Sequence, residues 1–193
     1  MSALVETKAS KVNRLKVQNN FDSYLLRQVN LSDISNLVNV VSNNLTHLCK
    51  WLPWVGDVYN ASDAKNFIIQ SCEKFNNAAG ADYAVIASDA IIGIVGIHSI
   101  NWDDRLASIG FWMSSSYCGK GIATSAVRKL FAYLFDDLLL QKIVLTVAED
   151  NTASSKVAKK LGMESDGLLI KPELLHGKYI NHVAYRLENW VRK

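Results

Sequence analysis

Residues 109–124 read Ile-Gly-Phe-Trp-Met-Ser-Ser-Ser-Tyr-Cys-Gly-Lys-Gly-Ile-Ala-Thr, and this stretch decides the predicted fold. Its first part completes the run Leu106–Met113, whose β-branched and aromatic residues are typical of a strand. Its last part opens a long amphipathic helix at Ile122. Between the two, Gly119 and Gly121 permit a tight turn and place no side chain over the first helical N–H groups. Those groups lie at the positive end of the helix dipole, so we expect an anion site suited to a pyrophosphate.

The glycine turn has a simpler interpretation, because many such turns only cap a helix and hold no ligand. The spacing excludes two nucleotide motifs. The GxxxxGK[ST] pattern of a P-loop is missing, and a GxGxxG fingerprint would require glycine where Thr124 stands. A phosphate-bearing ligand held by backbone N–H groups fits the stretch better.

Apolar periodicity and turn residues predict the elements on both sides of this stretch. A short turn at Asp89-Ala90 joins two of the strands, and Gly162 closes the last helix. Strands that form an antiparallel meander, followed by a strand–helix–strand–helix unit, imply an α+β fold whose mixed sheet has a parallel segment. The other predicted strands are 23–29, 83–88, 91–100, 142–148, 163–170 and 179–187, and the other predicted helices are 33–43, a segment capped by Ser62, and 151–161.

The length and composition fit one folded domain. The chain has 193 residues, of which 49% are hydrophobic, and a chain of this size buries roughly 70% of its unfolded surface. We expect a polar, basic N-terminal extension at residues 1–20 and a single domain at residues 21–193. The sequence contains no run of about 18 apolar residues, so no membrane span is expected. It also shows no apolar signal core. A cytoplasmic location is therefore expected, with no membrane partner.

The charge distribution argues against a nucleic-acid partner. The net charge is +3, and residues 1–20 alone carry that excess. A nucleic-acid-binding protein would more often carry a basic stripe on its folded body. The three cysteines form no CxxC pair and the four histidines show no HxxxH or HExxH spacing, so no metal site is expected.

Four segments in order resemble the GNAT superfamily of acetyltransferases. Residues 109–124 look like the superfamily's motif A, in which the turn cradles the pyrophosphate of coenzyme A. Residues 151–163 resemble its Asn-x-x-Ser helix, and residues 173–185 its C-terminal segment. Trp51-Leu-Pro-Trp54 is similar to a segment of the ribosomal-protein serine and alanine acetyltransferases. The resemblance covers about residues 23–190, and it implies a mostly antiparallel sheet of six to seven strands whose splayed central strands bind acetyl-CoA.

The resemblance also implies roles for particular residues. Glu173 stands at the position of the proposed base, although a solvated loop glutamate is the simpler interpretation. Ser154 stands at the position of the proton donor to the thiolate, although it can equally be an ordinary polar residue of a first helical turn. The expected oxyanion donor is a backbone N–H near Met113 or Ser114, where a bulge splays the strands. The residues expected to bind the cosubstrate are Trp112, Met113, Ser114, Cys118, Gly119, Lys120, Gly121, Ile122, Ala123, Thr124 and Asn151, the last of which also caps its helix.

Three positions depart from the superfamily pattern. Cys118 replaces the usual Gln or Arg of the turn, Ala158 stands where a tyrosine acid is common, and Asn181 replaces an aspartate of the subgroup. Cys118 invites a nucleophile interpretation, since a thiol at a helix N-terminus has a lowered pKa. That chemistry would need a partner histidine, and the sequence identifies none.

The chemistry expected is direct acetyl transfer from acetyl-CoA to a primary amine. Apolar neighbours of Glu173 would raise the pKa of its carboxyl toward a useful range for a base. By resemblance, the acceptor is the N-terminal serine or alanine of a ribosomal protein. Two alternatives stay open: a polyamine or aminoglycoside acceptor, and a module that binds acetyl-CoA without catalysis. Trp51 and Trp54 either line the acceptor cleft or belong to the core. By analogy, a homodimer is also expected.

Overall fold

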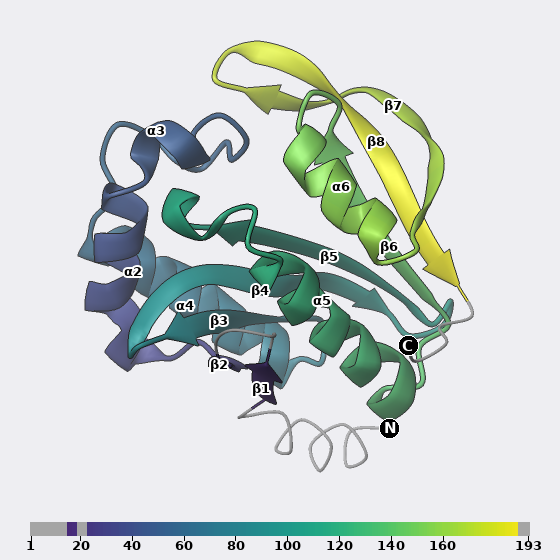
Figure 1. The fold of residues 1–193 in the computed structure, drawn as a ribbon, viewed down its shortest axis with the longest axis horizontal. Helices are drawn as coiled ribbons and strands as arrows, with labels where there is room; N and C mark the ends of the chain where they lie inside the picture. Colours follow the sequence, from purple (N-terminus) through teal and green to yellow (C-terminus); the bar gives the residue numbers. More distant parts are fainter. Residues whose placement is uncertain (1–14, 19–22, 189–193) are drawn as a thin grey trace.

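One mixed sheet organises the molecule (Figure 1). The computed structural model describes residues 15–18 and 23–188. Within these residues the sheet has eight strands in the order β1-β2-β3-β4-β5-β6-β8-β7. Neighbouring strands are antiparallel except β5 and β6, which are parallel. The strands are β1 (Leu15–Gln18), β2 (Ser23–Gln28), β3 (Ala81–Ala87), β4 (Ala90–Asn101), β5 (Leu106–Met113), β6 (Lys142–Ala148), β7 (Glu164–Leu175) and β8 (Lys178–Glu188).

The mixed α+β sheet with its one parallel segment confirms the fold expected from the sequence. The count exceeds six to seven strands because Leu15–Gln18 pairs with β2 at the sheet edge. Those four residues lie inside the segment that was expected to be a polar extension. Residues 1–14 and 19–20 of that segment lie outside the described residues.

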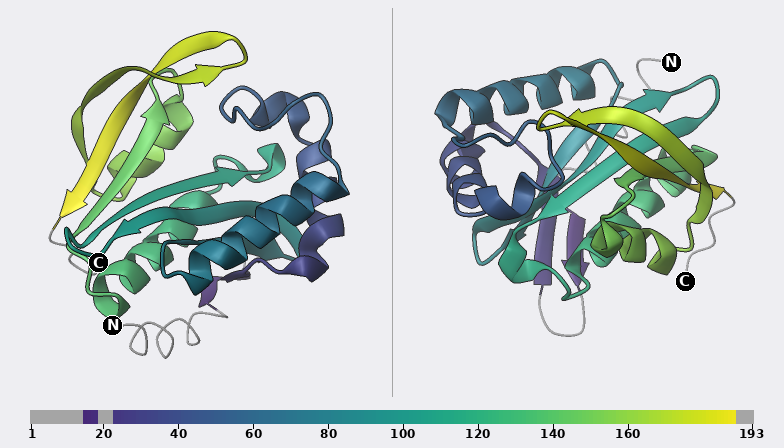
Figure 2. Two further views of the ribbon diagram at one scale, coloured as in Figure 1. Left: turned by 180° about the vertical axis from the view of Figure 1, so that it is seen from behind. Right: turned by 90° about the horizontal axis from the view of Figure 1, so that it is seen from above.

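Helices cover both faces of the sheet (Figure 2). On one face, α2 and α4 pack against apolar side chains of β3 and β4. On the other face, α5 and α6 enclose the larger of the two apolar clusters. The helical segments are η2 (Leu31–Asp33), α2 (Ile34–Ser42), α3 (Leu45–Leu48), α4 (Ala61–Asn76), η3 (Ser115–Tyr117), α5 (Ile122–Ala132), the π-helical η4 (Tyr133–Asp137) and α6 (Thr152–Lys160).

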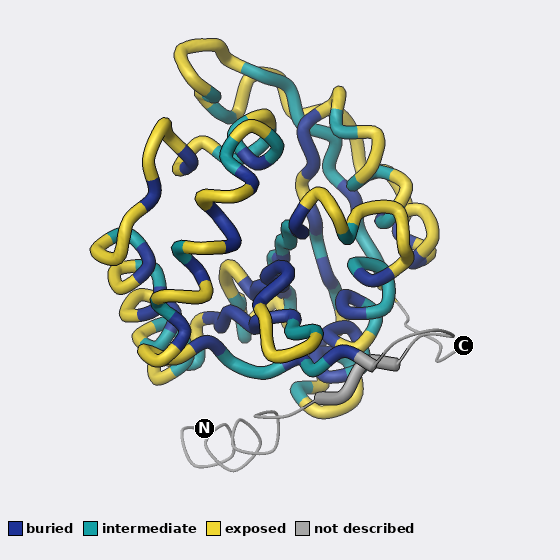
Figure 3. The backbone as a smooth tube through the Cα atoms, turned by 60° about the vertical axis from the view of Figure 1, so that its left-hand side comes forward, coloured by how far each residue is buried: buried dark blue, intermediate teal, exposed yellow. Residues whose placement is uncertain are grey.

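Buried backbone gathers between these layers, while exposed segments lie on the outer turns and the outer helix faces (Figure 3). Ile122, Leu130 and Phe131 of α5 are fully buried, as their helical spacing predicts. Among the described residues, no helix is both long and apolar enough to span a membrane.

Two predicted boundaries shift by one or two residues. The cap of α4 is Asn60, not Ser62, because the Asn60 side chain accepts the N–H groups of Ser62 and Asp63. The Asp63 carboxylate accepts the Asn60 N–H in return, at 2.9 Å, which completes a capping box. The turn between β3 and β4 is formed by Ser88 and Asp89, whose φ angles are 48° and 63°. Two successive positive φ angles match the twist that a two-residue hairpin needs.

The parallel pair β5–β6 parts after only a few residues. Its register runs from the pair Leu106 and Lys142 to the pair Ile109 and Leu145. Beyond Ile109, β5 continues beside β4 to Met113, while β6 continues beside β8 to Ala148. The two strands therefore open like a V toward their C-terminal ends (Figure 1). The expected splay is present and lies directly before the glycine turn.

Candidate active site

The glycine turn lies at the open end of this V. Gly119 and Gly121 have φ angles of 77° and 79°, in the left-handed region that favours glycine. Gly121 is the N-cap of α5. A Cβ atom built on either glycine would meet no heavy atom within 4 Å, so the space in front of the turn is open. The predicted order of strand, turn and helix is therefore observed.

Backbone N–H groups converge at the start of α5. The N–H of Ser125 donates to the Gly121 carbonyl at 3.0 Å, which closes the first turn of the helix. The N–H groups of Ile122, Ala123 and Thr124 precede it and have no carbonyl of their own helix to bond. Together with the helix dipole they form an anion-binding end. Lys120 adds a positive charge, with its Nζ 5.1 Å from the centre of the Tyr117 ring.

Met113 presents an unpaired backbone N–H to the gap between β5 and β6. The Ser114 N–H donates to the Ile92 carbonyl at 2.7 Å, which makes Met113 and Gly93 a non-hydrogen-bonded pair. The N–H of Met113 therefore points away from β4, to the side from which β6 has departed. Of the two donors expected at this point, Met113 is available, and Ser114 is already engaged.

The expected bulge near Met113 is not where the strand register shifts. The irregularity between β4 and β5 falls between Ile97 and Ser99, on β4. The V arises because β6 leaves β5 to pair with β8. Trp112 also differs from its expected place, since its side chain packs with the cluster on the α2–α4 face, opposite that of Met113.

Glu173 lies on β7 and forms a hydrogen bond with His182 of β8. The distance from Glu173 Oε2 to His182 Nε2 is 3.1 Å, with side chains 30% and 14% exposed. The glutamate is therefore held in place and is not a freely solvated loop residue. The apolar enclosure expected around it is incomplete, because Pro172 and Leu174 are exposed, although Leu175 is half-buried. Its neighbour is a histidine, which the sequence pattern did not identify.

Asn151 and Ser154 lie at the start of α6, three and six residues after the end of β6. The Asn151 side chain accepts the Ser154 N–H at 3.1 Å, which confirms Asn151 as the helix cap. Ser154 is half-buried. Because β5 and β6 are parallel, their C-terminal ends lie at the same edge of the sheet. Ala148 at the end of β6 pairs with His182, so the glutamate–histidine pair belongs to that edge as well.

The hydrogen bonds of Asn181 account for an asparagine where the subgroup has an aspartate. Its Nδ2 donates to Glu149 Oε2 at 3.0 Å, and its Oδ1 accepts the Lys171 N–H at 3.1 Å. An aspartate could accept the second bond but could not donate the first. The asparagine thus ties β7 to the segment that follows β6.

The environment of Cys118 disfavours the thiolate form of its side chain. Burial raises the pKa of its thiol from the ordinary value of 9.0, which does not support the nucleophile interpretation that a position near a helix N-terminus invites. The helix begins only at Ile122, four residues after Cys118, so the thiol does not belong to its first turn. A histidine does lie nearby, since His47 Nε2 is 3.7 Å from Cys118 Sγ, but the Ser114 carbonyl also accepts from the thiol at 3.5 Å.

The aromatic side chains near the end of β5 form one cluster. Trp54 lies 6.4 Å from Trp112 and 5.8 Å from Tyr59 between ring centroids. Trp54 is 48% exposed, whereas Tyr59 is buried. Burial raises the pKa of Tyr59 to about 12. Trp54 therefore presents an aromatic face at the surface beside β5, and Trp51 is half-buried.

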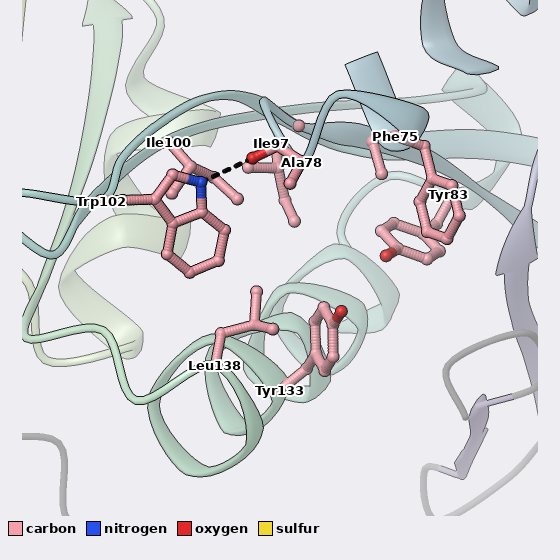
Figure 4. Close-up of a pocket in the computed structure, with 10 residues that line it drawn as sticks. Phe75, Ala78, Tyr83, Ile97, Ile100, Trp102, Tyr133 and Leu138 are labelled. Carbon is pink, nitrogen blue, oxygen red and sulfur yellow. Dashed lines mark hydrogen bonds between the residues drawn. The ribbon is translucent and has the colours of Figure 1, made fainter. Parts of the chain in front are cut away.

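A separate apolar pocket belongs to the core rather than to this site (Figure 4). Its lining includes Tyr133 and Leu138, which follow the C-terminal end of α5. The 11 residues of α5 separate it from the glycine turn, about 16 Å along the helix axis. Trp102 Nε1 donates to the Ala78 carbonyl at 2.8 Å, so this indole N–H is already bonded. Among the described residues, no group of His, Cys, Asp or Glu side chains could hold a metal ion.

A parted parallel strand pair beside a glycine-capped helix defines a class of proteins that hold a pyrophosphate-bearing donor at a sheet opening. Residues 24–164 match the family model described as the acetyltransferase (GNAT) domain. The chain belongs to this family, and it is therefore an acetyltransferase by family.

Three similar proteins give the comparison more detail. The ribosomal-protein-serine acetyltransferase of Escherichia coli (strain K12) is 24% identical over 158 residues, covering 82% of this chain and 88% of the relative. YdaF of Bacillus subtilis (strain 168), provisionally described as a ribosomal N-acetyltransferase, is 26% identical over 163 residues, covering 84% and 89%. The crystal structure of the microcin C7 self-immunity acetyltransferase MccE, in complex with acetyl-CoA and AMP, has a TM-score of 0.83 at 27% identity, covering 88% of this chain and 94% of that one. The resemblance to the ribosomal-protein subgroup is thus confirmed, and acetyl-CoA is the expected donor in this family.

Proposed function

We propose that this acetyltransferase moves the acetyl group of acetyl-CoA directly to the N-terminal α-amino group of a protein, with a ribosomal protein as the acceptor. One observation carries the proposal. The unpaired Met113 N–H and the free N–H groups at the start of α5 lie at the same sheet opening. The Met113 N–H suits the acyl oxygen of the donor, and the N–H groups of α5 suit its pyrophosphate.

The residues present fit the donor. The turn at Gly119 and Gly121 leaves open space, so a diphosphate can approach the backbone closely. Ile122, Ala123 and Thr124 offer N–H groups at the positive end of α5, and Lys120 adds charge. Bound acetyl-CoA supplies the acetyl carbon and a thiolate leaving group. The missing Gln or Arg at Cys118 weakens this cradle only modestly, because backbone groups form most of it.

The Met113 N–H acts as the donor to the acetyl oxygen. Its direction toward the gap supports this role, as does the burial of Met113, of which only 5% is exposed. A fixed donor in a site with little water stabilises the negative charge that develops on that oxygen. The Phe111 backbone has the same orientation along β5 and can bond the arm of the donor.

Glu173 acts as the base that removes a proton from the attacking amine. The His182 bond occupies Oε2 and leaves Oε1 to face the amine, directly or through a water molecule. An α-amino group has a pKa of about 7.7–8.0, against about 10.4 for lysine, so a carboxylate can deprotonate it more easily. This difference supports an N-terminal amine over a lysine side chain.

Ser154 completes the proton balance. As the C–N bond forms and the C–S bond breaks, the amine proton goes to Glu173 and the Ser154 hydroxyl gives a proton to the thiolate; Ser154 then regains a proton through solvent as Glu173 releases one. Its position in the first turn of α6, beside the end of β6, supports this assignment. The acetyl group passes in one transfer, and the raised pKa of the Cys118 thiol argues against a covalent enzyme adduct.

The test is release of the coenzyme A thiol from acetyl-CoA with a panel of acceptors. The panel holds peptides that begin with Ser, Ala or Met, the same peptides blocked at the α-amine, free lysine, polyamines and aminoglycosides. We expect release with the Ser and Ala peptides and none with their blocked forms. Release with polyamines or aminoglycosides alone would overturn the acceptor class. Acetyl-CoA binding without release for any acceptor would overturn catalysis and favour a binding module.

A further inference from the structure

Asn44 is a buried polar residue that joins two distant parts of the chain. It lies between α2 and α3, and only 8% of it is exposed. Its Oδ1 accepts the Ser115 N–H and the Ser115 hydroxyl, each at 2.9 Å, and the Ser114 hydroxyl at 3.3 Å. Its Nδ2 donates to the Val40 carbonyl at 2.8 Å. Both the oxygen and the nitrogen of the side-chain amide are thus bonded. The partners of the oxygen lie about 70 residues further along the chain.

The side-chain bonds of Asn44 do not cap α3, the helix that it precedes. Asn44 is the N-cap residue of α3 but makes no side-chain cap bond there. Ser115 is the first residue of η3, whose own N-cap, Ser114, makes no side-chain cap bond either. Asn44 therefore caps η3 from another element. The short helix η3 leads directly into Cys118 and the glycine turn.

The other end of η3 also meets α3. His47 Nε2 lies 3.7 Å from Cys118 Sγ, one residue after η3 ends. The segment that enters the turn is thus contacted at its first residue by Asn44 and just past its last by His47. Because the turn itself is exposed and has open space around it, these contacts are what locate it relative to α2 and α3.

We propose that Asn44 is a positioning residue that sets the place of the N–H groups receiving the pyrophosphate. This inference rests on the proposed function, since it assigns Asn44 to the donor cradle of that same site. Loss of the Asn44 side chain frees η3 and moves the turn away from its productive place. The loss should weaken recognition of the diphosphate while leaving recognition of the thioester and its arm at Met113 unchanged.

The test compares two donors in an Asn44→Ala variant. Acetyl-CoA carries the pyrophosphate, and S-acetylpantetheine carries the same thioester and arm without it. We expect the KM for acetyl-CoA to rise about tenfold, as loss of one to two hydrogen bonds implies, with less than about a twofold change for S-acetylpantetheine. Asn43→Ala is the matched control, because Asn43 lies at the same helix end and its side chain bonds, among the described residues, only the Asn39 side chain, at 2.8 Å. It should leave both KM values unchanged.

A second variant approaches the same bond from its other side. Ser115→Pro removes the N–H that Asn44 accepts, and proline is well tolerated at a first helical position. Ser114, with φ −56° and ψ 141°, already has the conformation that a residue before proline requires. If Asn44→Ala does not fold, Ser115→Pro decides, with the same split between donors expected.

Three outcomes would count against the proposal. Equal rises in both KM values would mean that Asn44 only supports the fold, and an unchanged acetyl-CoA KM would remove it from the cradle. If the unmodified protein itself used both donors equally well, the cradle at the glycine turn would fail, and the proposal with it. That last result concerns the proposed function, whereas the first two concern Asn44 alone.

Discussion

The donor side and the acceptor side of the site are built differently. On the proposed donor side, backbone groups are expected to do the binding, and buried residues hold them in place: Ile122 is fully buried, and Met113 and Ser114 are 5% and 7% exposed. On the acceptor side, the hairpin of β7 and β8 carries side chains such as Leu174 and Tyr179, which are 50% and 59% exposed. Under the proposed function, the conformation of the chain recognises the donor, and exposed side chains of the hairpin recognise the acceptor.

This difference has a consequence for both specificity and mutation. A backbone cradle accepts many sequences but one ligand shape, which suits a donor common to a whole family. Exposed side chains on a hairpin can change without disturbing the fold, which suits acceptors that differ between relatives. Substitutions should therefore act on the donor side through conformation and charge, and on the acceptor side through chemistry.

The largest effect is expected where charge meets the cradle. Gly121→Glu places a carboxylate before the N–H groups of α5, and like charges about 4 Å apart near a protein surface repel by roughly 4 kcal/mol. We expect acetyl-CoA affinity to fall roughly 1,000-fold, measured by calorimetry. Gly121→Ala is the matched control, since it carries the strain of a positive φ, about 1 kcal/mol, without the charge. Equal loss in both variants would show that strain, not charge, governs the cradle.

The next effect should fall on the rate and spare the donor. Glu173→Gln keeps the shape of the side chain and can still accept a bond from His182, but it cannot take a proton. We expect kcat to fall about 100-fold while the KM for acetyl-CoA stays constant. Glu164→Gln, at the far end of the same strand, is the control and should retain full activity. Unchanged turnover in Glu173→Gln would remove the base assignment.

A smaller effect is expected at the start of α6. Ser154→Ala removes the hydroxyl proposed to protonate the thiolate but keeps the N–H that Asn151 accepts. We expect kcat to fall about tenfold, with an unchanged melting temperature, because water can replace part of the proton donation. Ser155→Ala tests the neighbouring hydroxyl of the same half-buried turn and should have no effect. Similar losses in both variants would indicate a helix defect.

The smallest effect is expected at Cys118. Since backbone groups form most of the cradle, Cys118→Ser should change acetyl-CoA affinity and kcat by less than about twofold. The raised pKa of the thiol means that less thiolate is present at neutral pH than for an ordinary cysteine, and that the thiolate fraction grows only at a higher pH than it would for that cysteine. Alkylation of Cys118 at pH 7.5, followed by mass spectrometry, should be slower than that of a cysteine in an unfolded peptide. Fast alkylation at that pH would contradict the assignment.

The donor side was predictable because local rules govern it. The strand, the glycine turn and the apolar face of α5 follow from residues adjacent in sequence, and all three are found where periodicity placed them. Asn151 was likewise predictable as a cap, since its side chain bonds an N–H three residues on. Local rules were less precise for α4, whose cap is Asn60 and not Ser62, because two polar residues of similar capping strength lie only two positions apart.

The rest depends on contacts between distant segments. Nothing near Asn44 in the sequence points to Ser115, because the bond depends on how α2 and α3 pack against the end of β5. His182 lies nine residues from Glu173 and meets it only through the register of β7 and β8, which has irregularities. The Ser114 N–H is unavailable to a ligand because it bonds the Ile92 carbonyl across β4 and β5. A strand pattern in the sequence does not specify which N–H groups make such bonds.

The separation of β5 from β6 also divides the sheet into two parts of unequal size. Five strands lie on one side and three on the other, and only four residue pairs, from Leu106 and Lys142 to Ile109 and Leu145, join them through the sheet. A ligand that bonds Met113 on the five-stranded part, while residues of the three-stranded part contact its acetyl group, connects the two parts for as long as it is bound. Under the proposed function, the bound donor therefore also links the two parts of the sheet, and product release removes that link.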